Sequence, residues 1–192
     1  MKVKRFAVVV LALVMSLTLI TTSMATSPAS WTEDYEVYHF NGRTYAIFDL
    51  EVAWYEAIFL SEILGGKLAA ITSQEEQDFI YDILDNGGRK FYWLGGTDEN
   101  VEGEWEWVSG DEWSYDNLKG AQPGENYLGI LNTTASRQGT LYHKGDWNAF
   151  DYFGTEQDML DFGFICVWDF IHTPGEPLPD DPLDFGIALQ VI

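Results

Sequence analysis

Side chains with amide or carboxylate oxygens gather in the second half of the chain, close in sequence to aromatic residues. The set consists of Gln122, Glu125, Asn126 and Asn148, with Trp147 directly before the last. Such groups hydrogen-bond hydroxyls, and small-molecule pockets place a few of them among apolar walls. An exposed aromatic ring beside them would stack on the C–H face of a sugar. These residues therefore indicate binding of a hydroxyl-rich ligand, even without a metal.

The sequence carries no signature of catalysis. It contains no Ser, His and Asp set, no nucleophile elbow and no phosphate-binding glycine loop. A glycosidase needs two carboxylates that face each other across a cleft, but among 31 acidic residues some pair always qualifies. The histidines, His39, His143 and His172, lie far apart without partners at metal-ligand spacing, which argues against zinc. We predict that the protein is not an enzyme.

The elements that must position these groups include a tryptophan-rich pair of β-type segments, FYWLGGTDENVEGEWEW, over residues 91–107. The glycines after Trp93 let another backbone approach closely. From Glu104 onward charged and aromatic residues alternate, which places Trp105 and Trp107 on one face of a strand.

Two helices and a hairpin are predicted before this segment. Apolar residues at helical spacing predict a helix over residues 51–64, and two glycines end it. Ser73 and Glu76 match the capping box of a second helix, which runs to about Leu84. The hairpin covers residues 35–50 and turns at Asn41-Gly42. Because strands dominate after residue 90, we predict an α+β domain.

The order of these motifs resembles the C-type lectin-like domain family. The later matches are Gln122-Pro123, Gly-Asp-Trp-Asn over residues 145–148, and Gly-Phe-Ile-Cys over residues 163–166. The resemblance covers residues 35–170. It implies a C-type lectin-like fold, with two helices, twisted antiparallel sheets and a long loop region between about Glu112 and Trp147. It also implies that a carbohydrate or a protein is bound at that loop region.

Sugar-binding members of this family hold a calcium ion in the long loop, where it coordinates sugar hydroxyls. By resemblance, Gln122, Glu125 and Asn148 match three of the calcium ligands. Two positions depart from the pattern. Gly124 follows the proline where the family has Asp or Asn, and Ala149 follows Asn148 where the family has Asp. Calcium takes six to eight oxygens, several of them from carboxylates. We therefore expect weak calcium binding unless other oxygens substitute.

Three nearby residues carry oxygens that could replace the missing ligands: Asp146, Asn126 and Asp151. The predicted metal ligands are then Gln122, Glu125, Asn148 and Asp151. Asp151 lies two residues beyond the expected place and needs a bulge or a shifted loop. The predicted ligand-binding residues are Gln122, Glu125, Asn126, Trp147 and Asn148. For Trp147 itself we favour a core anchor over a ring that stacks on the ligand.

A single cysteine, Cys166, excludes a disulfide within the chain. Many family members bridge the first helix to the final strand, and the resemblance places Ser61 and Cys166 at those positions. A second bridge of the family corresponds to Tyr127 and Tyr152. The chain thus resembles a bacterial-type member that lacks the usual disulfides. With apolar neighbours on both sides, Cys166 is predicted to be a small buried residue rather than a reactive thiol.

The ends of the chain differ from its middle in composition. Residues 1–25 have the basic start, apolar run and Ser-Met-Ala ending of a secretory signal peptide. The run is shorter than the roughly 20 residues that span a bilayer, so we favour cleavage after Ala25 over a retained anchor. We predict a secreted, extracellular protein without a membrane span.

Residues 26–34 are predicted to be a linker, and residues 171–192 a Pro- and Asp-rich tail. The last eight residues of the tail are either a docking strand or unstructured.

The net charge of the chain is −21. Such an acidic protein is repelled by phosphate backbones and by anionic membrane surfaces, so nucleic acid and peripheral lipid are excluded as partners.

Two kinds of function remain. One is carbohydrate binding at the long loop, with or without calcium, and the other is protein binding or adhesion by a domain whose sugar and calcium site is degenerate.

Overall fold

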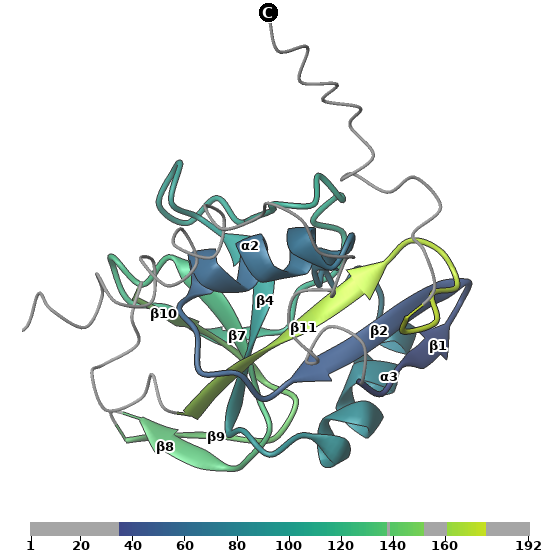
Figure 1. Cartoon of the computed structure of the whole chain (residues 1–192). Coiled ribbons are helices and arrows are strands. Elements are labelled where there is room, and N and C mark those ends of the chain that lie inside the picture. Colours follow the sequence, from purple (N-terminus) through teal and green to yellow (C-terminus); the bar gives the residue numbers. More distant parts are fainter. Residues whose placement is uncertain (1–34, 138, 152–160, 176–192) are drawn as a thin grey trace, which may run out of the picture. The chain divides into compact units, whose positions relative to one another are not determined.

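The computed structural model describes residues 35–137, 139–151 and 161–175. The predicted signal peptide, the linker over residues 26–34 and most of the C-terminal tail lie outside the described residues. All described residues belong to one compact unit. Their two α-helices and their strands form the predicted α+β fold (Figure 1).

The main sheet has the strand order β1-β2-β11-β4-β7-β10-β6. These strands are β1 (Tyr38–Phe40), β2 (Arg43–Phe48), β4 (Phe91–Thr97), β6 (Leu118–Gly120), β7 (Tyr127–Leu131), β10 (Trp147–Phe150) and β11 (Phe162–Trp168). The short strands β3 (Lys67–Leu68) and β5 (Glu106–Trp107) pair with β11 and β4. Strands β8 (Ala135–Arg137) and β9 (Thr140–Tyr142) form a separate hairpin.

The sheet is mixed, which refines the antiparallel arrangement that the resemblance implied. Strand β11 runs parallel to β4, and β10 runs parallel to β6. The long loop region also contains more strand than expected, because β7 lies inside it and is buried along its whole length between β4 and β10. The irregular stretch that remains lies mainly before β7.

Both predicted helices are present, as α2 (Trp54–Ile63) and α3 (Gln74–Ile83), and the 3₁₀-helix η2 (Leu84–Asn86) follows α3. Ser73 caps α3, since its hydroxyl accepts the backbone N–H of Glu76 at 3.1 Å. The Glu76 carboxylate does not accept the backbone N–H of Ser73, as a capping box would require. It accepts the backbone N–H of Thr72 at 2.7 Å instead, one residue earlier. The predicted hairpin turn is also present, with φ of 48° at Asn41 and 81° at Gly42.

Two hydrophobic clusters lie on opposite faces of the sheet. Neighbouring residues of a strand point to opposite faces, and along β2 and β11 they alternate between the clusters. One cluster combines Tyr45, Ile165 and Val167 with Ile80 of α3. The other combines Ala46, Phe164 and Cys166 with Trp54 and Ala57 of α2. Helices α2 and α3 therefore cover different faces of the sheet (Figure 1).

Cys166 is fully buried, and its Sγ lies 4.0 Å from the backbone oxygen of Ser61. Burial raises the pKa of the thiol to about 12, so it stays protonated at neutral pH. This environment confirms the prediction of an inert buried cysteine.

The packed part of the domain reaches past residue 170, where the resemblance ends. His172 is buried. Its Nε2 lies 2.6 Å from the hydroxyl of Tyr35, and its backbone N–H donates to Thr44 Oγ1 at 2.8 Å. These contacts join the first described residue to the segment after β11.

Candidate functional site

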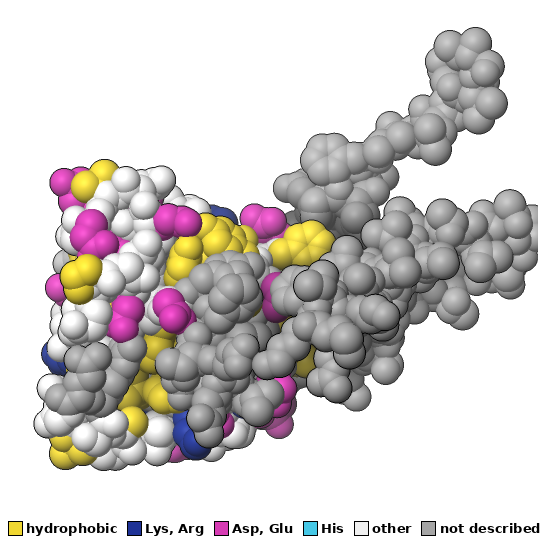
Figure 2. Space-filling model, turned by 90° about the vertical axis from the view of Figure 1, so that its left-hand side faces the viewer, with side chains coloured by type: hydrophobic (Ala, Val, Ile, Leu, Met, Phe, Trp, Pro, Cys, Tyr) yellow, Lys and Arg dark blue, Asp and Glu magenta, His cyan; other side chains and the backbone are white. Residues whose placement is uncertain are grey.

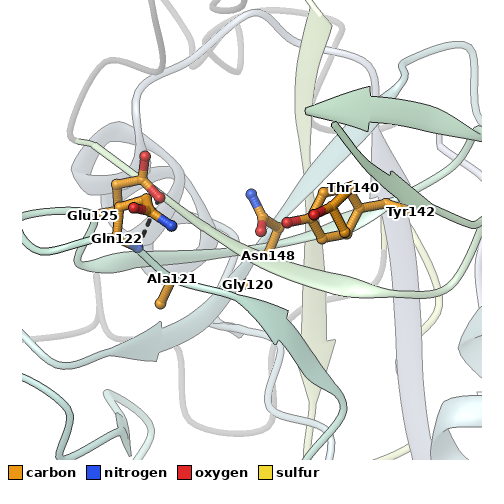
Figure 3. Close-up of a pocket in the computed structure, with 7 residues that line it drawn as sticks. All are labelled: Gly120, Ala121, Gln122, Glu125, Thr140, Tyr142 and Asn148. Atoms are coloured by element: carbon orange, nitrogen blue, oxygen red, sulfur yellow. Dashed lines mark hydrogen bonds between the residues drawn. The ribbon is translucent and has the colours of Figure 1, made fainter. Parts of the chain in front are cut away.

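A small polar pocket lies where β6, the turn after it, β9 and β10 come together (Figure 3). Its volume is about 90 Å³, and its walls are Gly120, Ala121, Gln122, Glu125, Thr140, Tyr142 and Asn148. The structure thus brings together three of the predicted site residues: Gln122, Glu125 and Asn148. In Figure 3, Gln122 and Glu125 face Asn148 across the pocket. A space of this size admits part of a sugar ring rather than a whole oligosaccharide.

Gln122 and Glu125 are held by a tight turn. Pro123 and Gly124 occupy its centre, and Gly124 has a φ of 84°, which is the pattern of a type II turn. The backbone N–H of Glu125 donates to Gln122 O at 2.9 Å, and the N–H of Gln122 donates to Glu125 Oε2 at 3.1 Å. The turn therefore fixes the carboxylate of Glu125 at the edge of the pocket and leaves the Gln122 side chain exposed.

Asn148 forms the inner end of the pocket. It lies on β10 between β7 and β6 and is only 3% exposed. Its Nδ2 donates to Ala149 O at 3.0 Å. Its Oδ1 is buried and has no hydrogen-bond partner among the described residues. A buried acceptor of this kind loses its hydration without compensation, and it is able to accept a hydrogen bond from a further donor.

Thr140 and Tyr142 complete the wall opposite the turn, and sequence reasoning did not single them out. Both come from β9 of the separate hairpin, whose turn contains Gly139 with a φ of 84°. The one available signal was the strand–glycine–strand pattern over residues 135–142. That pattern indicates a hairpin, but it does not say that the hairpin reaches the pocket.

Trp147 is a core residue. Its side chain is completely buried, and the indole N–H donates to Gln77 Oε1 at 2.8 Å. Its ring packs edge-on against Trp107, Trp113 and Tyr115. This placement agrees with the anchor interpretation and leaves no ring face for a ligand. Trp147 instead anchors β10 to α3 through its hydrogen bond to Gln77.

The last two predicted residues do not line this pocket. The backbone oxygen of Asn126 accepts the N–H of Asp98 at 3.3 Å. The Oδ1 atoms of Asn126 and Asp98 are both buried without hydrogen-bond partners among the described residues. Asp151 is exposed directly after β10. Both residues therefore sit apart from the Gln122, Glu125 and Asn148 group.

The side chains that line the pocket do not supply the oxygen ligands that calcium requires. The side chains with oxygen atoms there are the carboxylate of Glu125, the amides of Gln122 and Asn148, and the hydroxyls of Thr140 and Tyr142. Across the described residues, no group of three or more His, Cys, Asp and Glu side chains is placed to hold a metal. Asp146, a predicted substitute, accepts the backbone N–H of His143 at 2.8 Å in the turn before β10. Calcium takes six to eight oxygens, several of them from carboxylates, and the described pocket residues supply one carboxylate.

The sequence profile described as "Lectin C-type domain" matches residues 51–157. This match covers more than half of the chain. The chain belongs to the C-type lectin domain family. Members of this family are binding proteins, which agrees with the prediction that the protein is not an enzyme.

Among curated relatives, this C-type lectin is similar to C-type lectin domain family 4 member F of Rattus norvegicus. The two are 38% identical over 77 residues, which make up 40% of this chain and 14% of the rat protein. The mouse counterpart is 30% identical over 110 residues, or 57% of this chain and 20% of that protein. The chain thus spans a small part of the length of the relatives it matches.

Similar solved structures support the same family assignment. The carbohydrate-recognition domain of the mouse scavenger receptor C-type lectin is 29% identical, with a TM-score of 0.54 over 72% of this chain and 97% of that chain. The cow CD23 domain, solved with a GlcNAc2Man3 oligosaccharide, is 26% identical, with a TM-score of 0.53 over 71% and 95%. The Ca2+-independent lectin SPL-2 of Saxidomus purpuratus shares the fold at 19% identity, with a TM-score of 0.56 over 69% and 91%.

Proposed function

We propose that this C-type lectin binds a glycan at the pocket of Gln122, Glu125 and Asn148, through hydrogen bonds that require no calcium. The observation that carries the proposal is the buried Oδ1 of Asn148, which lacks a hydrogen-bond partner among the described residues. Leaving such an acceptor unpaired costs about 1–3 kcal/mol, and a hydroxyl that donates to it recovers this cost. The likeness to a cow domain solved with an oligosaccharide supports a glycan as the ligand.

The pocket residues have complementary roles toward vicinal hydroxyls. Asn148 accepts from the hydroxyl that enters most deeply. The carboxylate of Glu125 accepts from a neighbouring hydroxyl, and charge makes this bond the stronger one. The Gln122 amide both donates and accepts, so it can follow either hydroxyl orientation. The hydroxyl of Tyr142 lies in the pocket wall opposite Gln122 and Glu125.

The proposal is tested by measuring binding to a glycan array in calcium and in chelator. We expect the same glycans to bind in both buffers. Asn148→Ala and Gln122→Ala should each weaken binding about tenfold or more, since each removes a hydrogen-bonding group from the pocket. Gln74→Ala on α3 is the matched control, and it should bind as the unmodified protein does. Binding that disappears in chelator would reject the metal-free mechanism.

We further propose that the protein is exported and acts outside the cell. The basis is the signal-peptide pattern of residues 1–25, which lie outside the described residues. No helix of the described part is long and apolar enough to cross a bilayer. N-terminal sequencing of the mature protein should begin at Thr26. A retained N-terminus would reject cleavage at this position.

Protein binding is the second candidate function. It is favoured by the two positions at which the family's calcium ligands are absent. Gly124 has no side chain, and the short side chain of Ala149 is completely buried in β10. If the array contains no ligand for the purified protein, this candidate replaces the first.

A further inference from the structure

A second, larger cavity adjoins the polar pocket. Its volume is about 360 Å³, which lies within the range of small-molecule sites. Tyr142 and Asn148 line both spaces. A ligand whose hydroxyls reach Asn148 from the polar pocket therefore has the second cavity directly beside it.

The second cavity has an apolar wall, unlike the first. Phe91, Leu131 and Phe150 form this wall, and the rings of Phe91 and Phe150 meet edge to face at 5.4 Å. Phe150 and Leu131 belong to β10 and β7 of the central sheet, so the wall is rigid. Apolar side chains also gather in the middle of the face in Figure 2, on the side where β8 and β10 lie in Figure 1.

The charges on the described residues that line this cavity balance each other. The charged residues among them, Lys90 and Asp161, form an ion pair with 2.7 Å between Nζ and Oδ2. Each therefore offsets the field of the other. The preference of the cavity comes from its aromatic and aliphatic wall.

We infer that the second cavity holds an apolar substituent of the glycan bound at Asn148. The ligand is then an amphiphilic glycoside, with an aromatic ring or a short alkyl chain next to the recognised sugar, rather than a free sugar. This inference rests on the proposed glycan site. The polar pocket orients the hydroxyls, and burial of the apolar substituent supplies the additional affinity.

The experiment is isothermal titration of the purified protein with matched glycosides of glucose, galactose, mannose and N-acetylglucosamine. Each sugar is offered as its methyl and as its p-nitrophenyl glycoside. For the sugars that bind, we expect the p-nitrophenyl form to bind about tenfold more tightly, from the area of ring buried.

Two tryptophan substitutions on one hairpin localise the effect. Ala135 pairs with Tyr142 in the hairpin and lines the cavity, whereas Leu141 belongs to the neighbouring pair and is 57% exposed. Ala135→Trp should fill the cavity. It should abolish the gain from the p-nitrophenyl ring while methyl glycosides bind within about twofold of the unmodified protein. Leu141→Trp, the matched control, should retain the gain.

The outcomes separate this inference from the proposed function. If methyl glycosides bind and p-nitrophenyl glycosides bind no more tightly, the inference is overturned and the glycan site stands. A gain that persists in Ala135→Trp also overturns the inference, because the ring then lies elsewhere. Failure of every glycoside to bind would overturn both.

Discussion

Tyr142 and Asn148 meet above Gly120. A Cβ atom at position 120 would lie 2.5 Å from the Tyr142 hydroxyl oxygen and 2.6 Å from Asn148 Oδ1. Contacts this short force one of the two side chains to move. Gly120 lies on β6 opposite Asn148, so the absence of a side chain there keeps the polar pocket open. The pocket thus depends on a glycine that no ligand-binding motif would mark.

Gly120→Ala is expected to lower glycan affinity about tenfold or more, because the new methyl group occupies the pocket and displaces Asn148 or Tyr142. Overpacking of this kind also lowers the free energy of unfolding by about 1–3 kcal/mol. Titration calorimetry and urea unfolding measure the two effects. Gly88→Ala is the control, since its Cβ would meet only the end of the Asp49 side chain at 2.9 Å. Unchanged glycan affinity in Gly120→Ala would place the site elsewhere.

Much of the fold could be predicted because its signals are local. The hairpin at Asn41-Gly42 follows from turn chemistry, and the start of α3 follows from Ser73. The parallel pairing of β4 with β11 and of β6 with β10 has no such signal. It is set by contacts between distant segments.

The site was predictable in part for the same reason. Gln122, Glu125 and Asn148 stand in motifs with fixed order, and the structure brings them together. Asn126 was predicted with them as a polar side chain that could bind a sugar, but it adjoins Glu125, and neighbouring residues in extended chain point in different directions. Tyr142 was missed because its role depends on how the β8–β9 hairpin packs. That packing is a tertiary property.

The melting temperature should be the same in calcium, in magnesium and in chelator. A ligand that binds only the folded state raises stability by mass action, but the polar pocket offers calcium a single carboxylate, from Glu125. Scanning calorimetry of the purified protein measures the difference, and magnesium controls for screening of the net charge. A rise specific to calcium, lost in Glu125→Gln, would contradict the metal-free site.

Trp147→Phe is expected to destabilise the domain by about 2–4 kcal/mol while leaving glycan affinity within about threefold of the original. The phenyl ring is smaller than the indole and cannot donate to Gln77 Oε1, so the core loses packing and a buried hydrogen bond. Urea unfolding and calorimetry measure stability and affinity. Trp105→Phe, at a half-buried ring, serves as control and should cost about 1 kcal/mol or less. A large loss of affinity at unchanged stability would make Trp147 a ligand-stacking residue.

Alkaline pH should destabilise the domain in part through Cys166. Burial raises the pKa of this thiol from 9.0 to about 12. Between these values the unfolded chain releases the proton and the folded chain keeps it, so stability falls as pH rises. Cys166→Ala should lack this contribution, of about 1.4 kcal/mol per pH unit. The measurement is urea unfolding of both proteins from pH 8 to pH 11. Parallel pH profiles would show that the thiol does not contribute.

Ser61→Cys should create the bridge that the family resemblance places between the first helix and the final strand. Cys166 Sγ already lies 4.0 Å from the Ser61 backbone oxygen, and both residues are fully buried. A disulfide across the 105 positions between them constrains the unfolded chain strongly, and we expect it to add about 2–4 kcal/mol.

The gain from this bridge is reduced by the loss of the Ser61 hydroxyl, which donates to Ala57 O at 2.8 Å. Ser61→Ala isolates that cost, and a reductant isolates the contribution of the disulfide. Thiol titration of the oxidised, unfolded variant should detect no free thiol, and its melting temperature should fall when the reductant is added. Two titratable thiols after oxidation would mean that the helix and the strand do not approach in the geometry that a disulfide requires.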